Sequence, residues 1–315
     1  MRVRVVRMFG ATVLSVLFFI APPNFSQVSK SLQESSTLRV AIDLVLLDVT
    51  VHDKRGRPVT TLDQKDFKVY EDKLEQPISY FSQEESPVTW GLVLDRSGSM
   101  AGMIKEVYEA ALHVIDGGTN EDEVFIMTFS DRPEMVSELT SDPRTLQNSI
   151  FGLSAHGSTA LYDAVDSALD HIKRGRHRKK ALVVITDGAD NRSRLTFGRV
   201  MNRVKESDVL IYNVGMNVAA GEFAKGRAER GRLEQLAEIT GGYAYFPTDI
   251  KKCREAMANI AREISEHYTI GYYPTNRSHD GRWRKSRVVV ADSNQRNTQY
   301  FARSRTGYYA PASEK

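Results

Sequence analysis

Three short segments of this 315-residue chain carry hydroxyl and carboxylate side chains where they could hold a metal ion. Asp95-Arg96-Ser97-Gly98-Ser99 directly follows the apolar run Trp90–Leu94, and Thr186-Asp187-Gly188 directly follows Ala181–Ile185. The third segment, Gly157-Ser158-Thr159, precedes a helical pattern. In open α/β sheets the loops at the carboxyl ends of the strands share one edge, where ligands bind. We therefore expect the three segments to converge.

The D-x-S-x-S segment also has a simpler interpretation. Asp and Ser side chains in a strand-to-helix loop often cap the next helix by accepting hydrogen bonds from its free N–H groups. Asp95, Ser97 and Ser99 fit either role when they are considered alone. With Thr159 and Asp187 at the corresponding places on two other loops, the pattern favours a metal site.

The sequence resembles the von Willebrand factor A family, which includes the integrin I domains. The metal-ion-dependent adhesion site of that family uses D-x-S-x-S, a threonine and an aspartate, and all five positions are present as Asp95, Ser97, Ser99, Thr159 and Asp187. The resemblance spans roughly residues 89–267. The segments VTVHDKRGRPVTTLDQKDFKVYED, GSTALYDA, YTIGYYP and GYYA also resemble bacterial exported proteins related to this family, which implies an architecture more than an activity.

The resemblance implies a bound Mg²⁺ or Mn²⁺ ion, and the chemistry of the five side chains agrees with it. Ser97, Ser99 and Thr159 are expected to ligate directly, and Asp95 and Asp187 directly or through water. Three hydroxyls and two carboxylates supply hard oxygen donors but only two negative charges. Mg²⁺ prefers six oxygen ligands and usually keeps positions for water or substrate. An Asp or Glu carboxylate of a partner could fill the open position.

The implied function is adhesion or assembly outside the cytoplasm, by metal-dependent binding of a protein partner. An alternative is a structural scaffold of an envelope complex, in which the metal only staples loops together. A metal-dependent hydrolase is less favoured, because the seven histidines are scattered and neither an H-E-x-x-H helix nor a G-x-S-x-G elbow is present. His156, near Thr159, could act as a base or be an exposed loop residue. We therefore expect no enzymatic activity and no catalytic residue.

The charge of the chain does not predict nucleic-acid binding. The 43 Lys and Arg residues exceed the 40 Asp and Glu residues by three, and Arg2, Arg4 and Arg7 account for that excess. The densest basic run, Arg174–Lys180, lies between a helix and a strand, where it is usually a solvated loop. It would lie at the end of the sheet opposite the metal site. No nucleic-acid-binding motif accompanies it.

The elements that must position the candidate ligands alternate between strands and helices. Apolar runs predict buried strands, and stripes at helical spacing predict the helices between them. Such alternation predicts a doubly wound, mostly parallel sheet that is covered on both faces. The predicted strands are 90–94, 124–129, 181–185, 209–214 and 243–246, and the predicted helices carry Ile104 to Val114, Leu161 to Ile172, Phe197 to Lys205, Leu233 to Glu238 and Ile250 to His267.

Strand patterns on both sides of this α/β unit predict a second, smaller domain. Before it, alternating apolar residues run from Leu38 to Val51, and short strands follow at Phe67–Tyr70 and Ile78–Phe81. After it come the three strands Tyr268–Tyr273, Ser286–Val290 and Tyr300–Tyr309. We predict that the α/β domain is inserted into one small β-sandwich. The predicted boundaries are a signal peptide at 1–26, sandwich segments at 37–86 and 268–312, and the α/β domain at 87–267.

The N-terminal residues predict export to the bacterial cell envelope, the periplasm or the medium. Three arginines precede an apolar run from Met8 to Ala21, which Pro22-Pro23 ends. The run is shorter than the ~20 apolar residues of a membrane helix, so it fits a secretory signal. No clear cleavage site follows, and an uncleaved segment would anchor the protein in a membrane.

Two further features each have a plain and a functional interpretation. Cys253 is the only cysteine; it could be reactive or pair between chains, but it shares a helical face with Met257, Ile260 and Ile264, which favours a buried thiol. The polar stretch Met216–Arg232 is long for a strand-to-helix loop. It could shape partner choice at the metal edge or be a flexible insertion.

Overall fold

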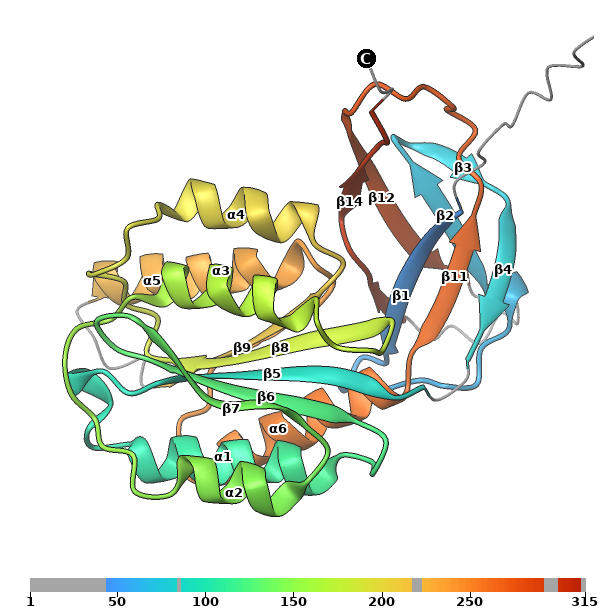
Figure 1. Cartoon of the computed structure of the whole chain (residues 1–315). Coiled ribbons are helices and arrows are strands. Elements are labelled where there is room, and N and C mark those ends of the chain that lie inside the picture. Colours follow the sequence, from blue (N-terminus) through green and yellow to red (C-terminus); the bar gives the residue numbers. More distant parts are fainter. Residues whose placement is uncertain (1–43, 84–85, 217–222, 292–299, 313–315) are drawn as a thin grey trace, which may run out of the picture. The chain divides into compact units, whose positions relative to one another are not determined.

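The computed structural model describes residues 44–83, 86–216, 223–291 and 300–312. The elements between Val88 and Ser265 form an α/β domain around one sheet with the strand order β10-β9-β8-β5-β6-β7 (Figure 1). Neighbouring strands are parallel except for β7, which is antiparallel to β6. The strands are β5 (Val88–Asp95), β6 (Glu123–Phe129), β7 (Pro133–Thr140), β8 (Lys179–Thr186), β9 (Leu210–Gly215) and β10 (Ala244–Tyr245).

Helices cover both faces of this sheet (Figure 1). One face packs on α1 (Ile104–Gly117), α2 (Pro143–Ile150) and α6 (Ile250–Ser265), and the other on α3 (Leu161–Ile172), α4 (Phe197–Glu206) and α5 (Phe223–Glu238). Along β5, Leu92 and Leu94 belong to the first apolar cluster and Val93 to the second. Both faces of the strand are therefore buried, which explains its continuous apolar sequence.

Strands from both ends of the described chain form two antiparallel sheets, with the orders β13-β1-β11-β4 and β14-β12-β2-β3. Their inner faces share one apolar core. In one sheet Leu47 is paired with Ile270 on the neighbouring strand, and in the other sheet Val69 is paired with Val288. The predicted α/β domain inserted in a β-sandwich is thus confirmed. The strands are β1 (Val45–His52), β2 (Phe67–Glu71), β3 (Leu74–Gln76), β4 (Ile78–Ser82), β11 (Tyr268–Tyr272), β12 (Trp283–Val290), β13 (Phe301–Arg303) and β14 (Gly307–Tyr309).

Two predicted segments differ in the structure. The stretch Met216–Arg232 is not one long loop, because α5 begins at Phe223 and packs Leu233 into the core. The predicted last strand, Tyr300–Tyr309, is two strands, β13 and β14, which belong to different sheets. Residues 1–26, and the part of the first predicted strand before residue 44, lie outside the described residues. Within the described residues, no helix is both long enough and apolar enough to span a membrane.

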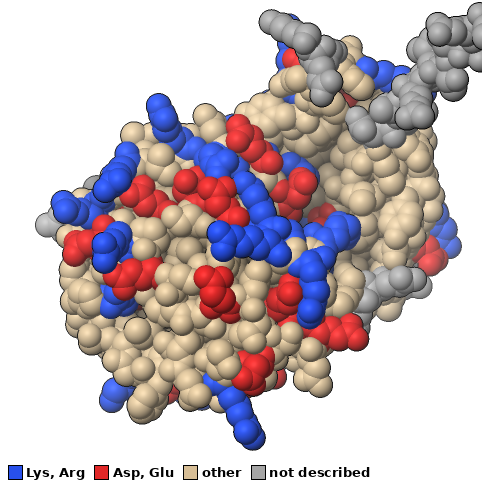
Figure 2. Space-filling model, viewed as in Figure 1, with Lys and Arg blue, Asp and Glu red and all other residues tan. Residues whose placement is uncertain are grey.

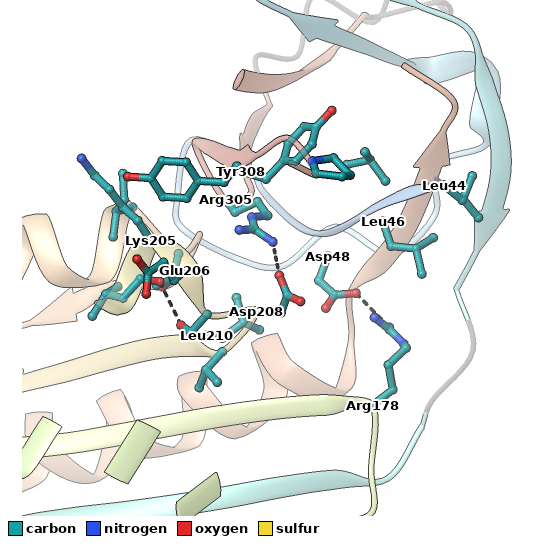
Figure 3. A pocket seen from close by; sticks show the side chains of 18 residues that line it. Leu44, Leu46, Asp48, Arg178, Lys205, Glu206, Asp208, Leu210, Arg305 and Tyr308 are labelled. Carbon is teal, nitrogen blue, oxygen red and sulfur yellow. Dashed lines mark hydrogen bonds and ion pairs between the residues drawn. The ribbon is translucent and has the colours of Figure 1, made fainter. Parts of the chain in front are cut away.

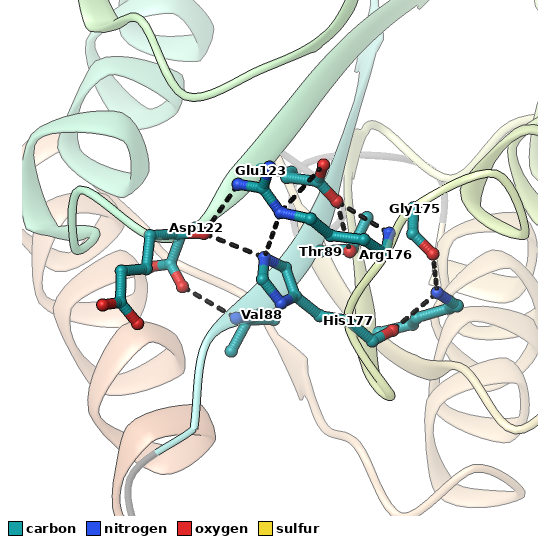
Figure 4. A network of polar contacts seen from close by, with 9 residues as sticks. Val88, Thr89, Asp122, Glu123, Gly175, Arg176 and His177 are labelled. Atoms are coloured by element: carbon teal, nitrogen blue, oxygen red, sulfur yellow. Dashed lines mark hydrogen bonds and ion pairs between the residues drawn. The ribbon is translucent and has the colours of Figure 1, made fainter.

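The basic run Arg174–Lys180 lies at the amino end of β8, opposite the end that carries Thr186. Its Arg174, Arg176 and Arg178 side chains are exposed, as predicted for a solvated loop, but polar contacts also hold its backbone in place (Figure 4). The carboxylate of Glu123 accepts hydrogen bonds from the backbone N–H of Arg176, at 2.9 Å, and from the Thr89 hydroxyl, at 3.2 Å. Lys180 donates to two carbonyl oxygens of the run itself. These contacts hold the turn against the edge of the sheet.

The same run also contacts the β-sandwich. Lys179 is only 2% exposed, and its Nζ lies 2.7 Å from Nδ1 of His267. Arg178 forms an ion pair with Asp48 of β1 at 3.0 Å. Lys179, Lys180 and Arg178 are therefore paired within the protein, and on the face in Figure 2 basic and acidic side chains are intermingled. Neither observation points to a nucleic-acid surface.

Candidate metal centre

Asp95 is the last residue of β5 and the anchor of the candidate centre. Its side chain is fully buried, with Oδ1 accepting from the backbone N–H of Ser97 at 2.8 Å. Oδ2 accepts from the hydroxyl of Thr186, the last residue of the neighbouring strand β8, at 2.7 Å. The carboxylate thus fixes the turn of its own loop and joins it to the loop that carries Asp187.

Backbone hydrogen bonds join the three loops to one another. The N–H of Gly98 donates to the carbonyl of Gly157 at 3.0 Å, and the N–H of His156 donates to the carbonyl of Arg96 at 2.8 Å. The N–H of Asn191 donates to the carbonyl of Thr159 at 3.0 Å. The loops predicted to converge therefore do meet at the carboxyl edge of the sheet.

The five predicted ligands differ in how open they are to solvent. Ser97 and Thr159 are buried, Asp187 is partly exposed, and Ser99 is exposed. The hydroxyl oxygens of Ser97 and Ser99 lie 3.0 Å apart. Thr159 makes its hydrogen bonds to Asn191 through its backbone carbonyl and its backbone N–H. The donors thus run from the buried carboxylate of Asp95 outward to the surface at Ser99.

Positive backbone φ angles occur where the loops turn around this edge. Gly157 has φ +77°, and a Cβ there would lie 2.8 Å from Oδ2 of Asp131. Gly188 has φ +85° and packs against Leu233 of α5. Glycine adopts such angles without the steric cost that other residues meet.

A set of supporting residues was not predicted from the sequence. Oδ1 of Asn191 accepts from the N–H of Thr159 at 2.9 Å, and Asp190 accepts from the N–H of Tyr162 in the first turn of α3. Asp163 in return accepts from the N–H groups of Arg194 and Leu195. These contacts fix the Thr159 loop to the Asp187 loop. The only sequence signal for them is the polar run D-G-A-D-N-R-S after an apolar strand.

Arg96, the variable second residue of the D-x-S-x-S segment, is another residue whose role was not predicted. Its side chain is buried between Glu134 of β7, with which it forms an ion pair, and the ring of His156, 3.5 Å away. His156 itself is exposed. Arg96 therefore ties the first loop to the Thr159 loop, and His156 contacts Arg96 and the carbonyl of Ser154.

The electrostatics of the edge suit a cation. Burial raises the pKa of Asp95 to about 6, and the negative charge of Asp187 adds to this, although hydrogen bonds from Thr186 and Ser97 oppose it. A nearby positive charge would stabilise the ionised form of Asp95. Among the residues that the structure describes, no group of three or more His, Cys, Asp or Glu is arranged to hold a metal. Any ion at this edge would therefore depend on the hydroxyls, whose hard oxygens suit Mg²⁺.

Two other features lie away from this edge. A cavity of about 530 Å³ lies between the outer face of β1 and the end of α4, with the ion pairs Asp48–Arg178 and Asp208–Arg305 in its wall (Figure 3). It contains none of the five predicted ligands.

Cys253 is fully buried in the core beside α1, as predicted, and burial raises the pKa of its thiol to about 11.

Comparisons with known proteins agree with this architecture. A family model for the von Willebrand factor type A domain matches residues 91–189, which include all five predicted ligands. A solved von Willebrand factor type A structure from Catenulispora acidiphila superimposes with a TM-score of 0.50 at 14% identity, covering 78% of this chain and 73% of that one. At such low identity this structure shows the fold alone.

Two curated bacterial proteins, both uncharacterized, are similar in sequence. One from Borreliella burgdorferi is 24% identical over 195 residues, 55% of this chain and 57% of its own length. One from Synechocystis is 30% identical over 127 residues, 38% of this chain and 30% of its own. The chain thus matches less than two thirds of either relative. Residues 91–189 of the α/β domain, with the D-x-S-x-S loop at the carboxyl edge of the sheet, thus match the von Willebrand factor type A domain, and the chain shares the fold of a solved protein of that type.

Proposed function

We propose that this protein binds a protein partner through Mg²⁺ or Mn²⁺ held by Asp95, Ser97, Ser99, Thr159 and Asp187, with an Asp or Glu of the partner completing the coordination. The observation that carries the proposal is the convergence of three loops, distant in sequence, at one edge of the sheet. Von Willebrand factor type A domains are generally interaction modules rather than enzymes. Adhesion or assembly outside the cytoplasm would suit the secretory signal that the sequence predicts at residues 1–26.

The charge balance supports an open coordination position. Mg²⁺ prefers six oxygen ligands, so five side-chain donors leave one position open, and because only two of the five are charged, the partner's carboxylate can take that position without a large excess of negative charge. Ser99 is exposed and Asp187 partly exposed, so a partner can reach the ion from solvent. The ion would supply a charge-assisted contact to the partner's carboxylate.

The alternative scaffold function, in which the ion only staples the loops, is less well supported. The loops are already joined by direct hydrogen bonds, such as Gly98 to Gly157 and Thr186 to Asp95. An ion is therefore not needed to hold them together. A hydrolase would need a base positioned beside the ion, and the ring of His156 contacts Arg96 instead.

The first test is thermal unfolding with EDTA and then with Mg²⁺ or Mn²⁺, on the wild type and on Asp95→Asn. An ion that binds only the folded state at ~100 times its Kd adds ~2.7 kcal/mol to the free energy of unfolding. We expect this rise in the wild type and its absence in D95N. The metal-free variant should stay within about 1 kcal/mol of the wild type, because losing one hydrogen-bond acceptor is offset by removing a buried charge.

Asp116→Ala is the matched control, because Asp116 is exposed near the end of α1, away from the three loops. It should keep the full metal-dependent rise. Equal stabilisation of the wild type and D95N would remove the ion from this site, and no rise in either protein would exclude both the metal-dependent function and a scaffold whose loops are stapled by the ion.

A further inference from the structure

The turn between β6 and β7, residues 130–132, is a fourth loop at the carboxyl edge of the sheet. None of its residues is among the five predicted ligands. β6 runs parallel to β5, and its last residue, Phe129, is paired with Asp95. The carbonyl of Phe129 accepts a hydrogen bond from the N–H of Arg96 at 2.9 Å. The turn therefore begins directly beside the D-x-S-x-S loop.

Two contacts of this turn lie on either side of Thr159. The N–H of Ala160 donates to the carbonyl of Ser130 at 2.8 Å. The N–H of Ser158 donates to Oδ1 of Asp131 at 3.1 Å. The N–H and the carbonyl of Thr159 itself bond to the loop that follows β8. The backbone on both sides of a predicted ligand is thus fixed by the β6–β7 turn.

Asp131 makes its contact through its side chain, so the contact depends on the residue type at this position. Its Oδ2 packs against the backbone of Gly157, where a Cβ would lie only 2.8 Å from it. Gly157 has φ +77°, and its carbonyl accepts from the N–H of Gly98 at 3.0 Å. The N–H of Ser158, and then the charge of Arg192, lower the pKa of Asp131, so its carboxylate is ionised at neutral pH.

We infer that Asp131 is a positioning residue of the metal centre, which holds the Gly157–Ser158 backbone so that the Thr159 hydroxyl faces the ion. This inference rests on the proposed metal-dependent function. Both carboxylate oxygens of Asp131 face that backbone, so Asp131 acts through the loop and not as a further ligand. Glycine has more backbone freedom than other residues, so the segment at Gly157 needs such a restraint.

The experiment uses Mn²⁺ alone as the probe. Calorimetric titration of the full chain would compare the wild type with Asp131→Ala and Asp131→Asn, and thermal unfolding in EDTA would give the Tm of each metal-free protein. D131A should bind Mn²⁺ about tenfold more weakly, as is typical when a residue that orients a metal ligand is removed. D131N should stay within about threefold of the wild type, because its amide oxygen can accept the same hydrogen bond. The metal-free Tm of both variants should stay within about 2 °C of the wild type, since Asp131 is exposed.

Asp142→Ala is the matched control. Asp142 is also exposed and also accepts from backbone N–H groups, those of Arg144 and Thr145. It follows the end of β7 that pairs with the start of β6, away from the carboxyl edge. D142A should therefore bind Mn²⁺ as the wild type does.

Three results would overturn the positioning role and leave the proposed function intact. Unchanged Mn²⁺ affinity in D131A would show that the backbone contacts suffice. Equal weakening in D131A and D131N would assign the effect to the charge of Asp131 and not to its hydrogen bond. A metal-free Tm that falls together with the affinity would assign Asp131 to the stability of the fold. Absence of Mn²⁺ binding in the wild type would overturn the proposed function as well.

Discussion

Glu263 of α6 joins the α/β domain to the β-sandwich through one buried carboxylate. Its Oε1 accepts from the hydroxyl of Tyr245 at 2.7 Å and lies 3.1 Å from Nε2 of His52 on β1. Its Oε2 forms an ion pair with Arg303 of β13. Burial by itself raises the pKa of Glu263, but His52, Arg303 and Tyr245 outweigh it and lower the pKa from 4.5 to about 2.

We predict that Glu263→Gln destabilises the protein in a pH-dependent way. A carboxyl group whose pKa is lowered on folding contributes stability above its unfolded pKa and loses it as the pH falls through its folded pKa. The shift from 4.5 to about 2 corresponds to about 3 kcal/mol at neutral pH. The stability difference between wild type and E263Q should therefore be about 3 kcal/mol at pH 7 and shrink between about pH 5 and pH 2.

Urea denaturation of both proteins at pH 7, 5, 4 and 3 measures this difference. Subtracting the variant from the wild type cancels the other carboxyl groups that titrate over this range. Glu255→Gln on the same helix, where Glu255 is exposed, should differ from the wild type by less than about 0.5 kcal/mol at each pH. A difference for E263Q that stays constant from pH 7 to pH 3 would falsify the assignment of this stability to the ionised carboxylate.

Three further outcomes follow from the structure. Arg96→Met should weaken Mn²⁺ binding about tenfold in a calorimetric titration, because the Asp95–Ser99 loop loses its ties to Glu134 and to His156 of the Thr159 loop; unchanged affinity would show that the backbone bonds suffice. Gly242→Ala should lower the free energy of unfolding by about 1–3 kcal/mol, since its Cβ would lie 1.9 Å from the carbonyl oxygen of Ile211. Urea denaturation measures this, and an unchanged midpoint would contradict it. Cys253 should react with a thiol reagent at pH 8 only as fast as the protein opens, because it is buried and its pKa is raised to about 11; labelling within seconds would refute its burial.

The strands of the α/β sheet could be predicted because burial on both faces makes them continuously apolar. The edge strand β7 escaped prediction, since its sequence, Pro133–Thr140, is mixed and only Ser137 is buried. The sequence predicts a loop up to Arg232 where α5 lies, because Gly226 and Gly231 disfavour helix and the polar residues outnumber the apolar stripe formed by Leu233 and Leu236. In both cases packing against neighbouring elements outweighs local preference.

The five candidate ligands were predicted from a motif, but the residues that hold them were not. Asp190 and Asn191 act through hydrogen bonds to segments about thirty positions earlier in the chain, and no local pattern encodes such pairs. Arg96 occupies a variable position of the motif, so its burial against Glu134 depends on β7, which was itself not predicted. Whether the five ligands bind a metal stays a prediction.

The way the β-sandwich is assembled has a consequence for the order in which the protein forms. β1 pairs with β11 and β13, and β2 pairs with β12, so each sheet needs strands from both sides of the α/β domain. On the ribosome, β2 and β3 can pair with each other early, but β1, β4 and the other edge of β2 wait for partners that are synthesised after the α/β domain. The α/β domain can therefore fold while the first strands still have unpaired edges, and such edges are prone to aggregation. Because β11 to β14 are synthesised after α6, the sandwich can form only when translation is nearly finished. A chain truncated after α6 would expose the unpaired edges of β1, β2 and β4, and we expect it to aggregate unless a chaperone binds them.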